Sequence, residues 1–281
     1  MVMKRWSLVC CLFCSLLLTG CAVRLLYNWL DWAISWKMDD YFSLSRQQSR
    51  LLDDEVQNIL KWHRKNALPR YVNALRTLSF DLRHPLSERE VEYHMGVFEA
   101  LLKELAEGLK EPANRFAASL TDEQIASFMA ERLSKQAKLR KEWQENGAAD
   151  VHDDFVRKLK KNMENWLGEI DPSQEPLIQT WADWQQKYYP NWLDYQDVWL
   201  QAMGNTLKAR GTPAFEPELV QVLIKGRELG DGKFIRYVDA SRQLSIRWFS
   251  QLSASLTDEQ REHLRGRLSE LASDLDALSK N

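Results

Sequence analysis

The stretch Ala118-Ser119-Leu120-Thr121-Asp122-Glu123-Gln124 recurs in identical form at residues 254–260, and it decides how this 281-residue chain folds. A Thr followed three positions later by Gln is typical of a capping box. The Thr hydroxyl accepts from the backbone N–H of the third helical residue, and the Gln side chain bonds back to the backbone N–H of the Thr. Both stretches therefore predict a helix that begins directly after the Thr.

Two looser boxes begin at Ser45 and Ser87, where Gln48 and Glu90 stand in the third helical position. Asp171-Pro172 reads as a further start, because Pro fits the first helical position. The predicted N-cap residues of the boxes are Ser45, Ser87, Thr121 and Thr257. The two identical heptapeptides leave two interpretations open: an internal duplication, or one good helix–turn–helix corner that arose twice.

Apolar residues recur at steps of three and four over most of the chain, a period that lines one face of a helix. It predicts an all-α fold, a multi-helix bundle of about ten to eleven antiparallel helices with short joins. Prolines such as Pro112 and Pro190 mark breaks or starts, and residues 147–150 form the softest boundary. The expected helices span residues 24–37, 46–66, 70–82, 88–109, 122–145, 151–168, 173–189, 191–209, 216–227, 233–253 and 258–279.

Residues 1–20 resemble a bacterial lipoprotein signal peptide. Lys4 and Arg5 give a positive start, and residues 8–18 form an apolar run too short to span a bilayer as a helix. Leu18-Thr19-Gly20-Cys21 is similar to the lipobox that precedes an acylated cysteine. We expect cleavage before Cys21, lipid on that cysteine, and a helical periplasmic domain of residues 21–281. The alternatives are an ordinary secretory signal and an uncleaved anchor.

The resemblance also bears on location, because an Asp after the acylated cysteine tends to retain lipoproteins in the inner membrane. Ala22 stands there, which favours the periplasmic face of the cell outer membrane. Three of the four cysteines lie before Cys21, so the mature chain has no disulfide and no spare thiol for a metal or a nucleophile. Loss of Lys4 and Arg5 leaves 36 basic against 40 acidic residues, and this net charge of −4 argues against nucleic-acid binding.

The sequence contains none of the motifs that mark phosphate-binding loops, hydrolase nucleophile elbows, zinc-protease helices or dinucleotide sites. We therefore expect a non-enzymatic protein with no catalytic residues, no cofactor and no metal. Glu90 and His94, one turn apart, and His152 beside two aspartates are weak metal candidates. Surface positions on charged helices explain them better.

A dense aromatic row follows helical spacing in the second half of the chain. Such a row packs as the core seam between helices or lines a groove for a peptide, a glycan or a lipid chain, because aromatic rings give a large contact area with a polar handle. Spacing favours the core, and both interpretations stay open. The candidate residues of this aromatic row are Trp181, Trp184, Tyr188, Trp192, Tyr195 and Trp199.

A second aromatic group follows Cys21 directly and includes Trp29, Trp32 and Trp36. Trp favours the membrane–water interface, so this helix suits a position on the bilayer. Asp31 and its acidic neighbours do not suit deep insertion, so packing on the bundle is an equal alternative.

The L-T-x-x-Q pattern at residues 120–124 and 256–260 resembles a signature of the Spy/CpxP periplasmic family, which are small helical proteins that sense envelope stress or chaperone unfolded clients. The lipobox followed by Leu26-Tyr27-Asn28-Trp29-Leu30 looks more like an uncharacterised family of proteobacterial all-helical lipoproteins, a resemblance that implies location and fold and no activity.

The sequence thus predicts a lipid-anchored, non-catalytic binding or scaffold protein of the cell envelope. A tethered chaperone or stress-related protein of Spy/CpxP character is the alternative. The expected partners are the membrane, through lipid on Cys21, and an envelope protein or peptide.

Overall fold

A computed structural model describes residues 20–223 and 225–280. This part of the chain is 89% helical, with ten α-helices and no strands, which confirms the all-α multi-helix fold. None of its helices has the length and apolar character needed to cross a bilayer. The α-helices are α2 (Gly20–Asn28), α3 (Leu30–Phe42), α4 (Arg46–Trp62), α5 (Leu68–Asp81), α6 (Glu88–Ser119), α7 (Asp122–Leu167), α8 (Glu175–Lys208), α9 (Phe215–Leu223), α10 (Gly232–Ser255) and α11 (Asp258–Ser279). Short π- or 3-10 turns are η1 (His63–Ala67), η2 (Pro172–Gln174) and η3 (Gly226–Leu229).

The structure corrects several predicted helix ends. α6 continues through Pro112, and α8 continues through Pro190, so neither proline ends a helix. A proline removes one helical hydrogen bond, but both halves of α8 pack along α7, and this packing outweighs the local cost. The helix expected at residues 24–37 is two helices that meet at Trp29.

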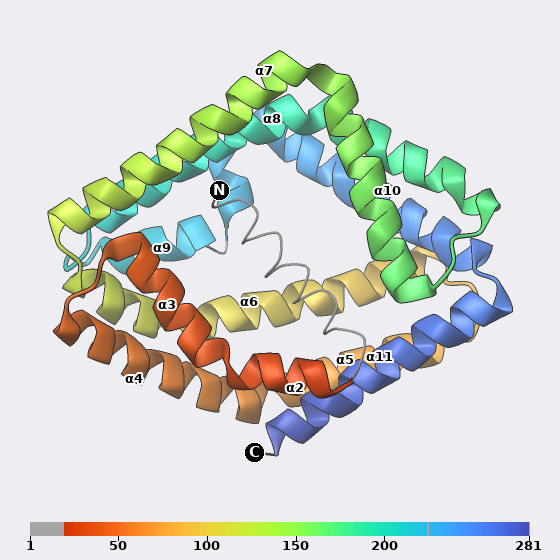
Figure 1. Cartoon of the computed structure of the whole chain (residues 1–281), viewed down its shortest axis with the longest axis horizontal. Coiled ribbons are helices and arrows are strands. Elements are labelled where there is room, and N and C mark those ends of the chain that lie inside the picture. The colour runs from red at the N-terminus through yellow and green to blue at the C-terminus, as the bar shows by residue number, and fades with distance from the viewer. Residues whose placement is uncertain (1–19, 224, 281) are drawn as a thin grey trace, which may run out of the picture.

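The helices pair along the edges of an open frame, and α6 crosses it (Figure 1). α7 and α8 form one long antiparallel pair, in which Gln136 Nε2 donates to the carbonyl of Leu193 at 2.9 Å. α7 leaves helical geometry at Gly147, whose φ of 76° favours glycine, and it turns sharply there (Figure 1). This point lies in the softest boundary predicted from the sequence, residues 147–150.

The second main antiparallel pair joins distant parts of the chain, because α11 packs along α5 (Figure 1). Arg265 Nε donates to the carbonyl of Ser79 at 2.9 Å, and Val72, Leu75, Leu268 and Ala272 form the apolar seam. Residues nearly 200 positions apart therefore hold each other in place.

Corner one is the place where α4 and α7 begin side by side. The hydroxyls of Ser45 and Thr121 accept from the backbone N–H of Gln48 (3.3 Å) and of Gln124 (3.2 Å). The two glutamine amides also pair with each other at 2.8 and 3.0 Å. Each amide donates in addition to the backbone carbonyl two residues before the partner's cap.

Corner two is the place where η2 leads into α8 beside the start of α11, and it repeats this pattern. Asp171 and Thr257 are the caps. Gln174 and Gln260 pair at 2.8 and 3.1 Å, and each donates to the carbonyl two residues before the partner's cap. The two corners therefore share one hydrogen-bond plan. At the remaining predicted cap, the Ser87 hydroxyl accepts from the backbone N–H of Glu90, the third residue of α6.

The apolar residues around the two corners also correspond. Leu52 and Ile178 each lie seven residues after a cap, and Leu120 and Leu256 directly precede a Thr cap. All four are buried. The two corners lie in different cores. Leu52 and Leu120 of corner one pack with Phe42 and Phe116. Ile178 and Leu256 of corner two pack around Trp248.

Candidate functional site

Most of the aromatic row of α8 is half-buried and packs against the segments that precede and form α10. The Trp184 indole donates to the Ser241 hydroxyl at 3.0 Å, and the Trp199 indole donates to the carbonyl of Val222 at 3.1 Å. Trp181 lies against Trp248, with ring centroids 5.2 Å apart. These indoles already have protein partners.

The remaining rings of the row divide between two sides of α8. Tyr188 stacks on Tyr237 and Tyr195 on Phe234, both on the α10 side, whereas Trp192 stacks on its own neighbour Tyr189. Burial raises the pKa of the Tyr195 hydroxyl, so it stays protonated at neutral pH. The row is therefore not one continuous face, because its members contact different helices.

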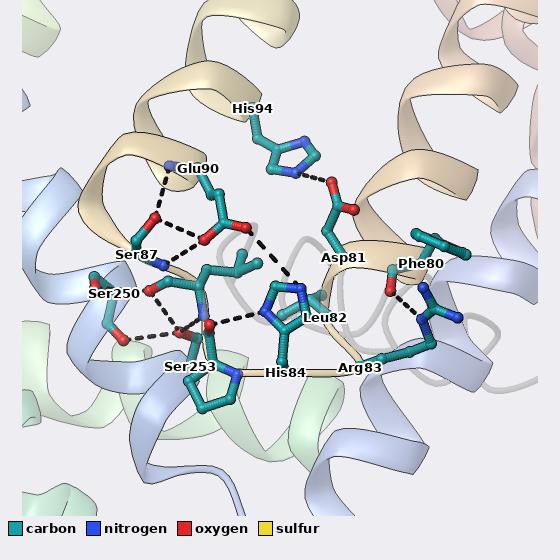
Figure 2. Close-up of polar contacts among 12 residues, drawn as sticks. Phe80, Asp81, Leu82, Arg83, His84, Ser87, Glu90, His94, Ser250 and Ser253 are labelled. Carbon is teal, nitrogen blue, oxygen red and sulfur yellow. Dashed lines mark hydrogen bonds and ion pairs between the residues drawn. The ribbon is translucent and has the colours of Figure 1, made fainter.

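Glu90 and His94 do not form a joint ligand set. Figure 2 shows the Glu90 carboxylate turned to Ser87, whose backbone N–H donates to it at 2.8 Å, while the His94 ring turns to Asp81 at 3.0 Å. The hydrogen bonds from Ser87 hold the pKa of Glu90 below its usual value. The cluster therefore fixes the turn between α5 and α6.

His152 has two carboxylate neighbours, Asp183 at 3.2 Å and Asp153 at 3.5 Å. Its contact with Asp183 joins α7 to α8. Among the side chains that the structure describes, no three His, Cys, Asp or Glu residues gather as a metal site requires.

The most exposed aromatic surface lies on α2 and α3. We call Leu25, Trp29, Trp32 and Trp36 the tryptophan ridge; their exposed fractions are 49%, 61%, 62% and 48%. The rings follow one another, because Trp29 meets Trp32 edge-on at 6.3 Å and Trp32 stacks on Trp36 at 6.1 Å. Large apolar side chains seldom gather in the open without a binding role.

The opposite face of α3 packs on the bundle. Phe42 is buried beside Phe128, and Ile34 and Met38 join the same core. The inner face of α3 therefore packs on the bundle, as one of the two alternatives left by the sequence predicts, and the tryptophan ridge points to solvent.

Polar contacts fix the angle of α3 on α4. Gln57 Nε2 donates to Asp31 Oδ2 at 2.8 Å, and the Ser35 hydroxyl donates to Asp53 Oδ1 at 2.6 Å. They lie in a groove of about 550 Å³ between the two helices. Its carboxylates on Asp31, Asp39 and Asp53 accept from protein donors. The lining residues are Asp31, Trp32, Ser35, Trp36, Asp39, Leu44, Ser49, Leu52, Asp53, Val56 and Gln57.

α2 is held against the far end of the chain. Arg24 Nε donates to Asp274 Oδ1 of α11 at 2.9 Å. The buried Tyr27 hydroxyl lies 2.8 Å from His63 Nδ1, on the π-turn η1. Burial lowers the pKa of His63 and raises that of Tyr27, so both are neutral at pH 7. These contacts orient the start of the tryptophan ridge.

The predicted lipidation site marks the start of this arrangement. Cys21 belongs to α2, and residues 1–19, with most of the expected signal peptide, lie outside the described residues. Sequence reasoning found the aromatic group after Cys21 but could not say which face was open. Its period of four, three and four residues from Leu25 to Trp36 was the available signal.

One protein-family model covers most of the chain. A model for a family of unknown function, DUF6279, matches residues 40–234, which include corner one and the start of corner two. Comparison with curated proteins and with solved structures gave no significant match. The tryptophan ridge precedes the matched range.

Proposed function

Because the chain belongs to DUF6279, a family of unknown function, we propose its function from its own residues: it is a lipid-anchored, non-catalytic binding or scaffold protein of the cell envelope. The observation that carries the proposal is the lipobox-like Leu18-Thr19-Gly20-Cys21 directly before a helix with an exposed aromatic face. Acylation of Cys21 would tether the helical frame to the membrane, and Ala22 favours the outer one.

The arrangement of α2 supports a scaffold. The helix that follows Cys21 binds α11 through Arg24 and η1 through Tyr27. The anchor would therefore attach to a fixed point of the frame, and the membrane would set the orientation of the whole domain. A scaffold protein presents its binding surfaces at a fixed angle, and a rigid attachment to the anchor would provide that angle.

The anchor is tested by Cys21→Ser in cells. The variant should lose all incorporation of labelled palmitate and remain as an unprocessed precursor. The wild-type protein should resist extraction by high salt and yield to detergent, since several acyl chains anchor stably whereas one holds only marginally. Equal palmitate labelling of variant and wild type would refute the lipoprotein assignment.

A tethered chaperone is the second candidate, and the middle of α6 favours it. Phe98 and Leu102 share one helical face there, and Leu102 is 65% exposed. Tyr93 is also exposed on the same helix. An open apolar face of this kind suits transient contact with unfolded clients.

The chaperone candidate predicts that the full chain slows the aggregation of an unfolded client protein. The pair Phe98→Lys and Leu102→Lys should remove that effect. Leu133→Lys is the matched control, because Leu133 is 51% exposed on a different helix, α7. Equal activity of the wild type and the α6 pair would exclude α6 as the client surface.

A further inference from the structure

We propose that the tryptophan ridge seats in the headgroup region of the lipid bilayer that holds Cys21, as a second point of membrane contact beside the lipid itself. The occupant of this open face is thus a lipid surface. The inference rests on the proposed lipid anchor for its geometry, and its test separates the two.

Spacing aligns the ridge with the anchor. Cys21 precedes Leu25 by four residues, one helical turn, and the ridge then continues at Trp29, Trp32 and Trp36. Steps of three and four keep residues on one side of a helix, so Leu25 lies one turn after Cys21 on α2, and Trp32 and Trp36 share one side of α3. Trp29 stands where the two helices meet, and its ring contact with Trp32 continues this surface from α2 onto α3.

The dimensions suit a segment that lies along the interface. An unbroken helix from Leu25 to Trp36 would be about 16 Å long, and the junction at Trp29 divides this length between α2 and α3. α2 is 9 residues long and α3 is 13 residues long. The described part of the chain holds no helix able to span a bilayer. An interfacial helix buries its apolar face about 5–10 Å into the headgroup and acyl boundary, which matches the reach of a Trp side chain.

The bundle fixes how deep the ridge can enter. The inner face of α3 is committed to the core through Ile34, Met38 and Phe42, so the helix cannot roll into the acyl region. Asp39 and Asp40 follow Trp36 and are exposed, and Lys37 donates to Asp40 at 2.7 Å. Charged groups at this end hold the helix at the level of the headgroups.

Residue type argues for lipid over a protein partner. Indole is enriched at the membrane interface because its ring prefers the apolar side and its N–H prefers the polar side. Three exposed indoles and a Leu, all within 15 residues of the expected acyl group, are held at the membrane by the anchor itself. A soluble partner would have to compete with a surface that is present at all times.

The test uses the full chain, purified with its anchor and reconstituted into vesicles of phosphatidylethanolamine and phosphatidylglycerol. A Trp6→Phe background removes the indole of any leader that is retained. Lipids brominated near the headgroup end of their acyl chains should quench Trp fluorescence, and lipids brominated near the chain ends should quench it less. The set Trp29→Phe, Trp32→Phe and Trp36→Phe should reduce the quenched signal several-fold, while circular dichroism stays unchanged.

The matched control is Trp166→Phe, compared one for one with Trp32→Phe. Trp166 is 40% exposed on α7, so its loss should leave the quenched signal as it was. Equal quenching before and after the ridge substitutions would overturn the proposal. So would ridge indoles that are shielded from aqueous acrylamide but not quenched by brominated lipid, because protein would then cover them.

Palmitate labelling of the same preparations reports on the anchor independently. Labelled protein with unquenched ridge indoles would refute the seated ridge and leave the lipid anchor in place. Unlabelled protein with quenched ridge indoles would refute the anchor and support the ridge as a membrane contact of its own.

Discussion

Corner one and corner two have the same paired glutamines in different surroundings. In corner two, Gln174 is fully buried and Gln260 nearly so, whereas in corner one Gln124 is only half-buried. The pairing of the amides and their bonds to the carbonyls two residues before each cap do not change. The polar plan therefore specifies the corner, and the apolar packing around it can differ.

The helix that leads into each corner shows where the two regions diverge. Asp31 lies 14 residues before the cap Ser45, and Arg157 lies 14 residues before the cap Asp171. Around Asp31 the outer surface is the tryptophan ridge. Around Arg157 it is a charged groove, where Lys160 pairs with Glu175 at 2.8 Å. Equivalent positions thus present an aromatic face on α3 and a charged face on α7.

These correspondences favour the duplication that the repeated heptapeptide suggested. The match extends beyond it to Ser45 and Asp171, which are not in the repeat, and to Leu52 and Ile178 behind them. The glutamine pairs and their carbonyl acceptors keep the same offsets in both corners, whereas the Asp171 carboxylate accepts from Ser173 N–H and the Ser45 hydroxyl from Gln48 N–H.

The largest expected effect is a difference in stability between the loss of a buried tryptophan near corner two and the loss of an exposed tryptophan of the ridge. Trp248 is 3% exposed and its indole donates to the carbonyl of Leu177 at 2.7 Å. Trp248→Ala should lower the free energy of unfolding by about 3–5 kcal/mol. Trp32→Ala, on the exposed ridge, should change it by less than about 0.5 kcal/mol. Urea unfolding of both variants measures the difference, and similar losses would show that the ridge is packed.

The next effect compares the two glutamine pairs. Gln260→Ala leaves the buried amide of Gln174 without its partner and should cost about 1–3 kcal/mol. Gln48→Ala should cost less, because water can reach the half-buried amide of Gln124 that this change leaves without its partner in corner one. Urea midpoints give the order, and a larger loss for Gln48→Ala would mean that burial does not distinguish the corners.

Much of the helical layout was predictable from local chemistry. The boxes at Ser45, Ser87, Thr121 and Thr257 predicted where helices begin, because a cap is a bond between residues three positions apart. Helix ends at Pro112 and Pro190 were predicted wrongly, since α6 and α8 continue through them, and α8 does so while packed along α7.

The candidate site was predictable only in part. Trp29, Trp32 and Trp36 were recognisable as interfacial residues from their type and their distance from Cys21. Their exposure depends on α4 and α11, which hold the other face through Gln57 and Asp274. Contacts between residues that are far apart in the sequence leave no periodic signal, so the open face could not be assigned beforehand.

The Thr caps should show a smaller effect that is the same in both corners. Thr121→Ala and Thr257→Ala each remove one bond to a backbone N–H and should each cost on the order of 1 kcal/mol. Ser at either position keeps the hydroxyl and should be tolerated. Thermal melting of the four variants tests this, and unchanged stability of both Ala variants would deny the boxes their capping role.

The smallest effect concerns the hydrogen bond between Tyr27 of α2 and His63 of η1. Burial between Tyr27 and Tyr71 lowers the pKa of His63 below its ordinary 6.5, because a charged imidazolium loses hydration there. The unfolded chain therefore takes up a proton near pH 6.5 while the folded chain does not. The contribution of His63 to stability is present above pH 6.5 and is lost as pH falls through that value toward the folded pKa.

His63→Gln should lack this decline, so the stability difference between wild type and variant should shrink or reverse on acidification. Urea midpoints on both sides of pH 6.5 measure it, and a difference that does not change with pH would show that His63 is hydrated in the folded protein.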